Sequence, residues 1–243
     1  MTGTGPVGEP APGVRVVLDG PVLRIVMDDP ATGNALTVAT VRGIRDAVRA
    51  AETAPAVRVV VLSGAAGTFS SGWHRHDPDL EPNSDARSEA ARRALGEAYL
   101  AIAGCPLPVL ARVQGWAFGA AVGLVGASDL AVSTNEAVFC LPEPRFGLVA
   151  NPAMVPCLAR WRPADAARFL LTGERFTGVQ AAEAGLVSRS VAADALDATV
   201  DELVNGVLAG APDAVAATKR LLGELAVSQL RARLDVAAGL VGR

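Results

Sequence analysis

The stretch of residues 113–123 constrains the fold of this chain more than any other segment. A β-prone run ends there at Gly115, and an apolar run begins just after Gly119. A strand that stops at glycine and restarts as a helix leaves free backbone N–H groups at the helix N-terminus. Together with the helix dipole, these groups favour a negatively charged atom in front of them. That anion is either a phosphate or a charge that appears only during a reaction, and this stretch alone leaves both open.

Composition fits a globular domain, since 51% of the 243 residues are hydrophobic and 19% are charged. A net charge of −3 gives no basic surface field and argues against a nucleic-acid partner. The three cysteines include no Cys-x-x-Cys pair, so neither a disulfide framework nor a thiolate metal site is expected. Residues 1–13 lack the pattern of a signal peptide, and the apolar span 115–127 is shorter than the roughly 20 residues that cross a bilayer. We therefore expect a soluble, cytoplasmic protein without a membrane span.

The first third of the chain predicts a hairpin followed by a parallel strand. Two β-prone runs, 14–18 and 22–27, flank an Asp-Gly turn. A helix is expected from a Thr37 cap to about residue 52, and a mostly apolar strand at 57–62. A strand, a helix and a strand in this order imply a parallel pair with a right-handed crossover.

Later segments are expected to pass from strands to helices. The predicted elements are a helix at 86–103, strands at 109–113, 129–133 and 137–140, an irregular loop at 141–145, and mostly helix from 164 to 241 with a break at 173–177. β-rich units therefore fill the first 140 residues, and the helical end is expected to be a subdomain.

A second glycine-containing turn, at residues 69–73, also follows a predicted strand. A glycine after a strand is by itself usually only a turn. Ligand sites in parallel sheets, however, form outside the carboxyl ends of the strands. Two such turns at one edge each aim a backbone N–H at one oxygen, which is the geometry of an oxyanion hole.

With these two turns, the chain resembles the crotonase, or enoyl-CoA hydratase/isomerase, superfamily. The matching segments occur in family order from about residue 14 to 225 and are residues 34–36, 69–73, 115–123, 128–130, 139–143, 171–177 and 184–187. The resemblance implies an α/β fold with a flexible tail at 1–13, a crotonase-like spiral of ββα units at 14–190, and a helical C-terminal subdomain at 191–243 that assembles homotrimers or hexamers. It also implies acyl-CoA substrates of fatty acid metabolism, with coenzyme A as part of the substrate and no other cofactor.

In that family, two backbone N–H groups hold the thioester oxygen as it becomes an enolate anion. Matched to the motifs, the donors are Trp73, just after Gly72, and Ala120, just after Gly119. Enolate charge develops only during reaction, so fixed dipoles lower the barrier without binding the substrate too tightly. The resemblance also implies that the backbone of Ala35, Leu36 and Ser71 contacts the nucleotide end of coenzyme A. Gly72 and Gly119 are expected to bind the substrate beside the two donors.

The acid/base groups depart from the family pattern. Family hydratases carry two glutamates; the second matches Glu143, whereas the first falls on Gly123, which has no side chain. Adding water needs one group to activate the water and one to manage the proton at Cα, but a single base moves a proton between two carbons. Isomerase-type chemistry is therefore favoured over hydration. The alternative is a non-catalytic acyl-CoA binding protein, in which Glu143 is only a loop carboxylate between two prolines.

Other polar residues of the 70–79 loop admit further interpretations. His74 and His76, the only histidines, are either a replacement acid/base pair or solvated loop residues. With the neighbouring aspartates they hint at a metal site, but they complete no zinc pattern, so no metal is expected. A hydrolase built on Ser70 or Ser71 with His74 is disfavoured because residues so close on one loop rarely reach triad geometry. Dinucleotide binding is set aside because no Gly-x-Gly-x-x-Gly follows the first strand.

Overall fold

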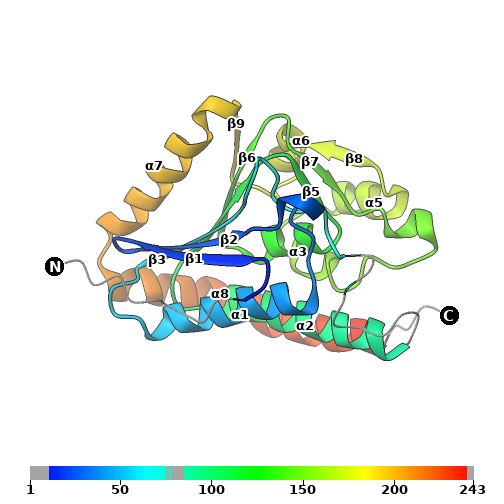
Figure 1. Ribbon diagram of the computed structural model, residues 1–243, viewed down its shortest axis with the longest axis horizontal. Coiled ribbons are helices and arrows are strands. Elements are labelled where there is room, and N and C mark those ends of the chain that lie inside the picture. The colour runs from blue at the N-terminus through cyan, green and yellow to red at the C-terminus, as the bar shows by residue number, and fades with distance from the viewer. Residues whose placement is uncertain (1–10, 75–76, 78–84, 240–243) are drawn as a thin grey trace.

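The structure is a computed structural model that describes residues 11–74, 77 and 85–239 (Figure 1). Residues 1–10 of the tail predicted at 1–13, together with His76 and Asp79, therefore lie outside the described residues. The division of the chain at residues 190/191 remains a prediction.

A six-stranded sheet forms the centre of the molecule, in the order β1-β2-β3-β4-β6-β9. Its strands are β1 (Val14–Asp19), β2 (Val22–Met27), β3 (Val59–Gly64), β4 (Val109–Val113), β6 (Leu130–Thr134) and β9 (Arg189–Val191). β1 and β2 form the predicted antiparallel hairpin, and β2 pairs with β3 in parallel, as expected for two strands joined through a helix. The fold predicted for the first third of the chain is confirmed.

Helices cover both faces of this sheet (Figure 1). In β3, Val60 and Leu62 pack with α1 (Val38–Thr53) and α2 (Asp85–Gly104), while Val59 and Val61 pack with α7 (Leu196–Ala209) on the other face. This alternation explains why the strand is apolar throughout, since successive side chains point to opposite faces. Thr37 caps α1 as predicted, because its hydroxyl accepts the Thr40 N–H at 3.1 Å.

A second, three-stranded sheet was not predicted. It consists of β5 (Trp116–Phe118), β7 (Val138–Cys140) and β8 (Arg175–Thr177), with β5 and β7 parallel. The sequence analysis expected only a turn at β5, and only a break or helix at β8 and β9. The strand predicted at 137–140 is present as β7, whereas β5, β8 and β9 are too short to show an alternating pattern and depend on pairing with distant segments.

The remaining helices are shorter, except for the last. They are α3 (Ala120–Ala127), α4 (Met154–Cys157), α5 (Pro163–Thr172), α6 (Gly178–Glu183), α7 and α8 (Pro212–Gly239), with 3-10 turns at Pro30–Thr32, Glu143–Phe146 and Ala193–Ala195. All eight residues of α3 are buried, which fits its uniformly apolar sequence. The helical C-terminal region is present as expected.

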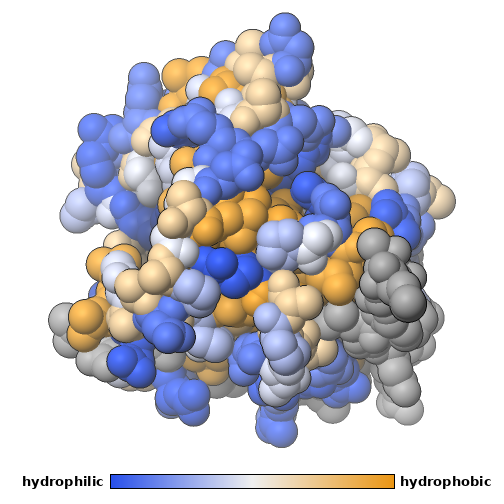
Figure 2. Space-filling model, turned by 90° about the vertical axis from the view of Figure 1, so that its left-hand side faces the viewer, coloured by the Kyte–Doolittle hydropathy of each residue, from blue (hydrophilic) through white to orange (hydrophobic). Residues whose placement is uncertain are grey.

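Within residues 11–74, 77 and 85–239, no helix is both long enough and apolar enough to span a bilayer. Figure 2 shows that hydrophilic residues cover most of one face, with an apolar area at its middle.

Lys219 anchors α8 to the rest of the fold. Its buried Nζ lies 2.6 Å from Asp129 Oδ2 and donates to Leu107 O at 2.8 Å. Lys219→Met is expected to lower the free energy of unfolding by about 1–3 kcal/mol, mainly because Leu107 O loses its charged donor. Asp129, which is partly exposed to water, loses an ion-pair partner at a smaller cost. Urea unfolding measures this, with Met at the exposed neighbour Arg220 as the control. Equal losses in the two variants would contradict the anchoring role.

Candidate active site

Three chain segments run parallel and end side by side around β5. On one edge of β5, Ser70 N donates to Trp116 O at 2.8 Å and Phe118 N donates to Ser70 O at 3.2 Å. On the other edge β5 pairs in parallel with β7, and Gly119 N donates to Cys140 O at 2.8 Å. The turn at Gly72, the start of α3 and the loop after β7 therefore leave the small sheet at the same end. Ligand sites form at such carboxyl ends.

The Trp73 N–H points toward β5. Gly72 O accepts Leu36 N at 2.8 Å on the opposite edge of the 69–73 segment. In a trans peptide the N–H points away from the C=O of the same unit, so the Trp73 N–H faces away from Leu36. None of the residues that the structure describes accepts a hydrogen bond from this N–H.

Close packing between two glycine turns brings the second N–H nearby. Gly72 adopts φ +91°, and a Cβ there would lie 2.6 Å from Phe118 O. Gly119, at φ +49°, then turns the chain into α3. Ala120 is the first residue of this helix, so its N–H has no acceptor within the helix. The predicted pair Trp73 and Ala120 is thus brought together, with both N–H groups unused by described residues.

Glu143 lies against the same turn. A Cβ at Gly119 would be 2.9 Å from Glu143 Oε1, so the carboxylate reaches the start of α3. Its Oε2 is buried and has no hydrogen-bond partner in the described part of the chain. Burial raises the pKa of the Glu143 carboxyl. A fully solvated carboxylate would show neither feature, so these observations favour a functional Glu143 over an ordinary loop residue.

Comparison with known proteins identifies the architecture around these residues. The family model "Enoyl-CoA hydratase/isomerase" matches residues 19–242. The chain belongs to this family. It is 32% identical over 214 residues to a carnitinyl-CoA dehydratase of Salmonella arizonae, covering 86% of this chain and 79% of that protein.

Solved structures agree with this assignment. A crystal structure of an enoyl-CoA hydratase from Mycobacterium avium superposes with a TM-score of 0.84 at 32% identity, covering 93% of this chain and 88% of that one. A protein from Magnetospirillum magneticum, described as an enoyl-CoA hydratase/carnithine racemase, gives 0.82 at 27% identity, covering 88% and 80%. The fold predicted from the resemblance is therefore confirmed.

The residues expected to contact coenzyme A lie beside the glycine-containing turn at residues 69–73. Ser71 N donates to Gly33 O at 2.9 Å, and Ser71 Oγ donates to Thr32 O at 2.8 Å. Ala35 N donates to Thr32 Oγ1 at 3.1 Å, while Leu36 pairs with Trp73. The segments that contain Ala35, Leu36 and Ser71 are thus joined into one loop pair next to Gly72.

Asn34 holds this loop pair in place, a role that the sequence analysis did not assign. Its side chain is 1% exposed, and its Nδ2 donates to Ala65 O at 2.9 Å and to Thr68 O at 2.7 Å. Its φ of +57° is one that asparagine tolerates better than most residues. The Asn-Ala-Leu sequence before a helix cap was the available signal.

The described polar candidates of the 70–79 loop, which are Ser70, Ser71, His74 and Asp77, all take part in hydrogen bonds of the fold. Ser70 Oγ accepts Gly72 N at 3.1 Å, and both serine hydroxyls are engaged in the turns, which does not favour a hydrolase. His74 N donates to Leu36 O at 2.8 Å, and Asp77 Oδ2 accepts Val38 N at 2.9 Å. Among the described residues, no three His, Cys, Asp or Glu side chains are grouped closely enough to hold a metal ion.

Proposed function

We propose that the chain is an acyl-CoA enzyme that holds the thioester oxygen on the N–H groups of Trp73 and Ala120 as it becomes an enolate, while Glu143 moves the proton. Two unused N–H groups beside a buried carboxylate suit this chemistry. The donors stabilise charge only as it develops, and the carboxylate reaches a hydrogen on the carbon next to the thioester. Coenzyme A enters as part of the substrate, and no further cofactor takes part.

The observation that carries this proposal is the unpaired Oε2 of Glu143. A buried carboxylate oxygen without a partner costs stability, and such atoms occur preferentially at functional sites. The raised pKa of the Glu143 carboxyl lies closer to neutral pH than that of an ordinary glutamate. A general base with such a pKa both accepts and returns a proton efficiently. A protein that only binds acyl-CoA would gain nothing from this arrangement, so the non-catalytic alternative is less well supported.

Double-bond isomerisation suits this site better than hydration. Position 123, which matches the first glutamate of family hydratases, is Gly123 and supplies no second carboxylate. One glutamate suffices to take a proton from one carbon of the substrate and return it to another. The second candidate is lyase chemistry, favoured by the relatives named carnitinyl-CoA dehydratase. Fatty acid metabolism, a cytoplasmic location and assembly into trimers or hexamers are parts of the same proposal.

Product analysis tests this function. The protein is incubated with 2-enoyl-CoA and 3-enoyl-CoA esters of several chain lengths. The products are separated by chromatography, and their masses are determined by mass spectrometry. An isomerase converts 3-enoyl-CoA to the conjugated 2-enoyl-CoA of unchanged mass. A product heavier by one water would support the lyase candidate instead. Acyl-CoA binding without turnover on any ester would support the non-catalytic alternative.

A further inference from the structure

Gly123 faces an aromatic ring at close range. A Cβ at this position would lie 2.5 Å from Tyr99 Cζ, closer still to the Tyr99 hydroxyl, and 3.0 Å from Ala153 O. Real Cβ atoms do not approach other atoms to 2.5 Å, so any side chain at 123 would displace the ring. The space beside Gly123 is therefore filled by Tyr99, which comes from a different helix.

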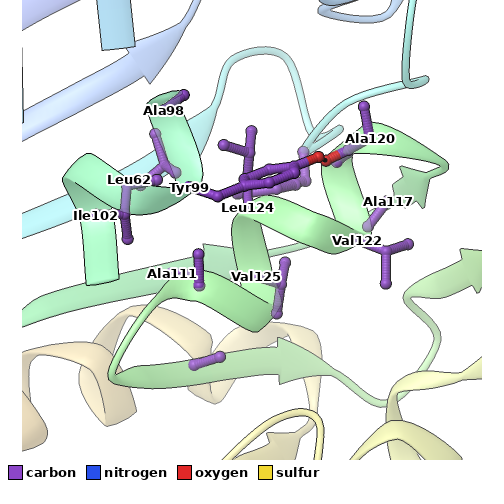
Figure 3. Close-up of a cluster of buried hydrophobic side chains, with 14 of the residues drawn as sticks. Leu62, Ala98, Tyr99, Ile102, Ala111, Ala117, Ala120, Val122, Leu124 and Val125 are labelled. Carbon is purple, nitrogen blue, oxygen red and sulfur yellow. Dashed lines mark hydrogen bonds between the residues drawn. The ribbon is translucent and has the colours of Figure 1, made fainter. Parts of the chain in front are cut away.

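The same tyrosine is bonded to the start of α3. Tyr99, in α2, is fully buried, and its hydroxyl donates to Ala120 O at 2.8 Å (Figure 3). Ala120 is the residue whose own N–H faces the site. The peptide planes that carry its N–H and its C=O meet at one Cα, so holding the C=O restrains the direction of the N–H.

The hydroxyl is suited to a permanent role as a donor. Burial raises the pKa of Tyr99 well above its usual value. A tyrosine hydroxyl is protonated at neutral pH, and this shift favours the protonated form further. A phenylalanine would fill the same space without a hydroxyl. A buried hydroxyl needs a hydrogen-bond partner, and here the partner is Ala120, the proposed oxyanion residue.

We propose that Tyr99 is a positioning residue of the oxyanion site: its ring fills the space beside Gly123 and its hydroxyl fixes the first turn of α3, so that the Ala120 N–H points at the substrate oxygen. This inference rests on the proposed function. The Tyr99 ring also occupies the space that a glutamate side chain at position 123 would need, so the two cannot be present together.

Tyr99→Phe tests the inference, with Ser128→Ala as the matched control. Ser128 Oγ donates to Leu124 O at 2.9 Å, so the control also removes one buried hydroxyl bond to α3, but at the opposite end. The main readout is the carbonyl stretching frequency of bound butyryl-CoA carrying ¹³C at the thioester carbon. Hydrogen bonds from the two donors lower this frequency in the complex with the unmodified protein.

Tyr99→Phe is expected to move the bound frequency back toward that of free butyryl-CoA. It should also lower kcat roughly tenfold, less than the loss of a whole donor, with KM nearly unchanged. Ser128→Ala should leave the frequency and kcat unchanged while lowering Tm to a similar extent. If the two variants lower Tm alike and neither moves the frequency, Tyr99 is only a packing residue and the inference is overturned.

The same experiment separates this inference from the proposed function. If the unmodified protein leaves the frequency of butyryl-CoA unshifted, the oxyanion assignment itself fails, and the role of Tyr99 fails with it. If the frequency is shifted but no enoyl-CoA is turned over, the proposed reaction fails, while the response of the frequency to Tyr99→Phe still decides the inference.

Discussion

Replacing Glu143 by glutamine is expected to lower kcat for enoyl-CoA isomerisation by about 10²–10⁴-fold, the usual contribution of a positioned general acid/base. Glutamine keeps the shape of the side chain but cannot accept the proton. Affinity for the acyl-CoA should change little, because the proposed oxyanion donors belong to the main chain. Steady-state kinetics and calorimetric titration with a saturated acyl-CoA measure the two quantities. Glu136→Gln, on the exposed turn between β6 and β7, is the control.

The same substitution should stabilise the protein at neutral pH. The pKa of Glu143 is raised in the folded state, so the unfolded chain releases this proton first as pH rises. The folded protein therefore loses stability as pH rises from the ordinary carboxyl pKa to the folded one, and Glu143→Gln avoids that loss. Its advantage should be absent in acid and greatest above the folded pKa. A variant that retains activity, or is less stable than the unmodified protein at neutral pH, would contradict the role given to Glu143.

The second large effect is expected for Gly72→Ala. The new methyl group would lie 2.6 Å from Phe118 O, a main-chain atom that cannot move aside as a flexible side chain does. The 69–73 segment and β5 must separate, which moves the Trp73 N–H away from the Ala120 N–H. We expect kcat to fall by about 10²–10³-fold, as when one oxyanion donor is lost. The acid limb of the pH–activity profile should keep its midpoint, because Glu143 is untouched.

Gly67→Ala is the control for that substitution. Gly67 also adopts a positive φ, +77°, but its Cβ would approach only Gln114 Nε2, at an ordinary 3.5 Å. It therefore carries a conformational strain of about 1–2 kcal/mol without separating the two turns. The control should lose stability and keep most of its kcat. Equal kcat losses in Gly67→Ala and Gly72→Ala would mean that strain in the loop, and not donor geometry, accounts for the effect.

Much of the fold was predictable because its signals are local. The hairpin around Asp19, the Thr37 cap and the apolar β3 each depend on residues that are close together in sequence. The small sheet was not predictable in this way. β5 pairs with β7 and with Ser70, and these contacts join segments that are far apart along the chain.

The residues of the candidate site likewise fall into those that a local motif indicates and those that depend on long-range contacts. Gly72, Gly119 and Glu143 stand in recognisable motifs, so a resemblance identified them and the structure places them together. Tyr99 stands in no motif, because nothing in an apolar stretch of α2 indicates that its hydroxyl reaches Ala120. From the sequence, Gly123 indicated only that a glutamate is missing at this position. The structure shows that the Tyr99 ring occupies the space beside it.

Hydrogen exchange at the α-carbon of a saturated acyl-CoA tests the central claim most directly. Butyryl-CoA is incubated with the protein in D₂O, and deuterium at the carbon next to the thioester is followed by NMR. Forming an enolate exchanges this hydrogen without any double bond in the substrate. The proposed site predicts exchange well above the buffer rate, and its loss in Glu143→Gln. Exchange at the buffer rate in the unmodified protein, or undiminished exchange in Glu143→Gln, would contradict the account.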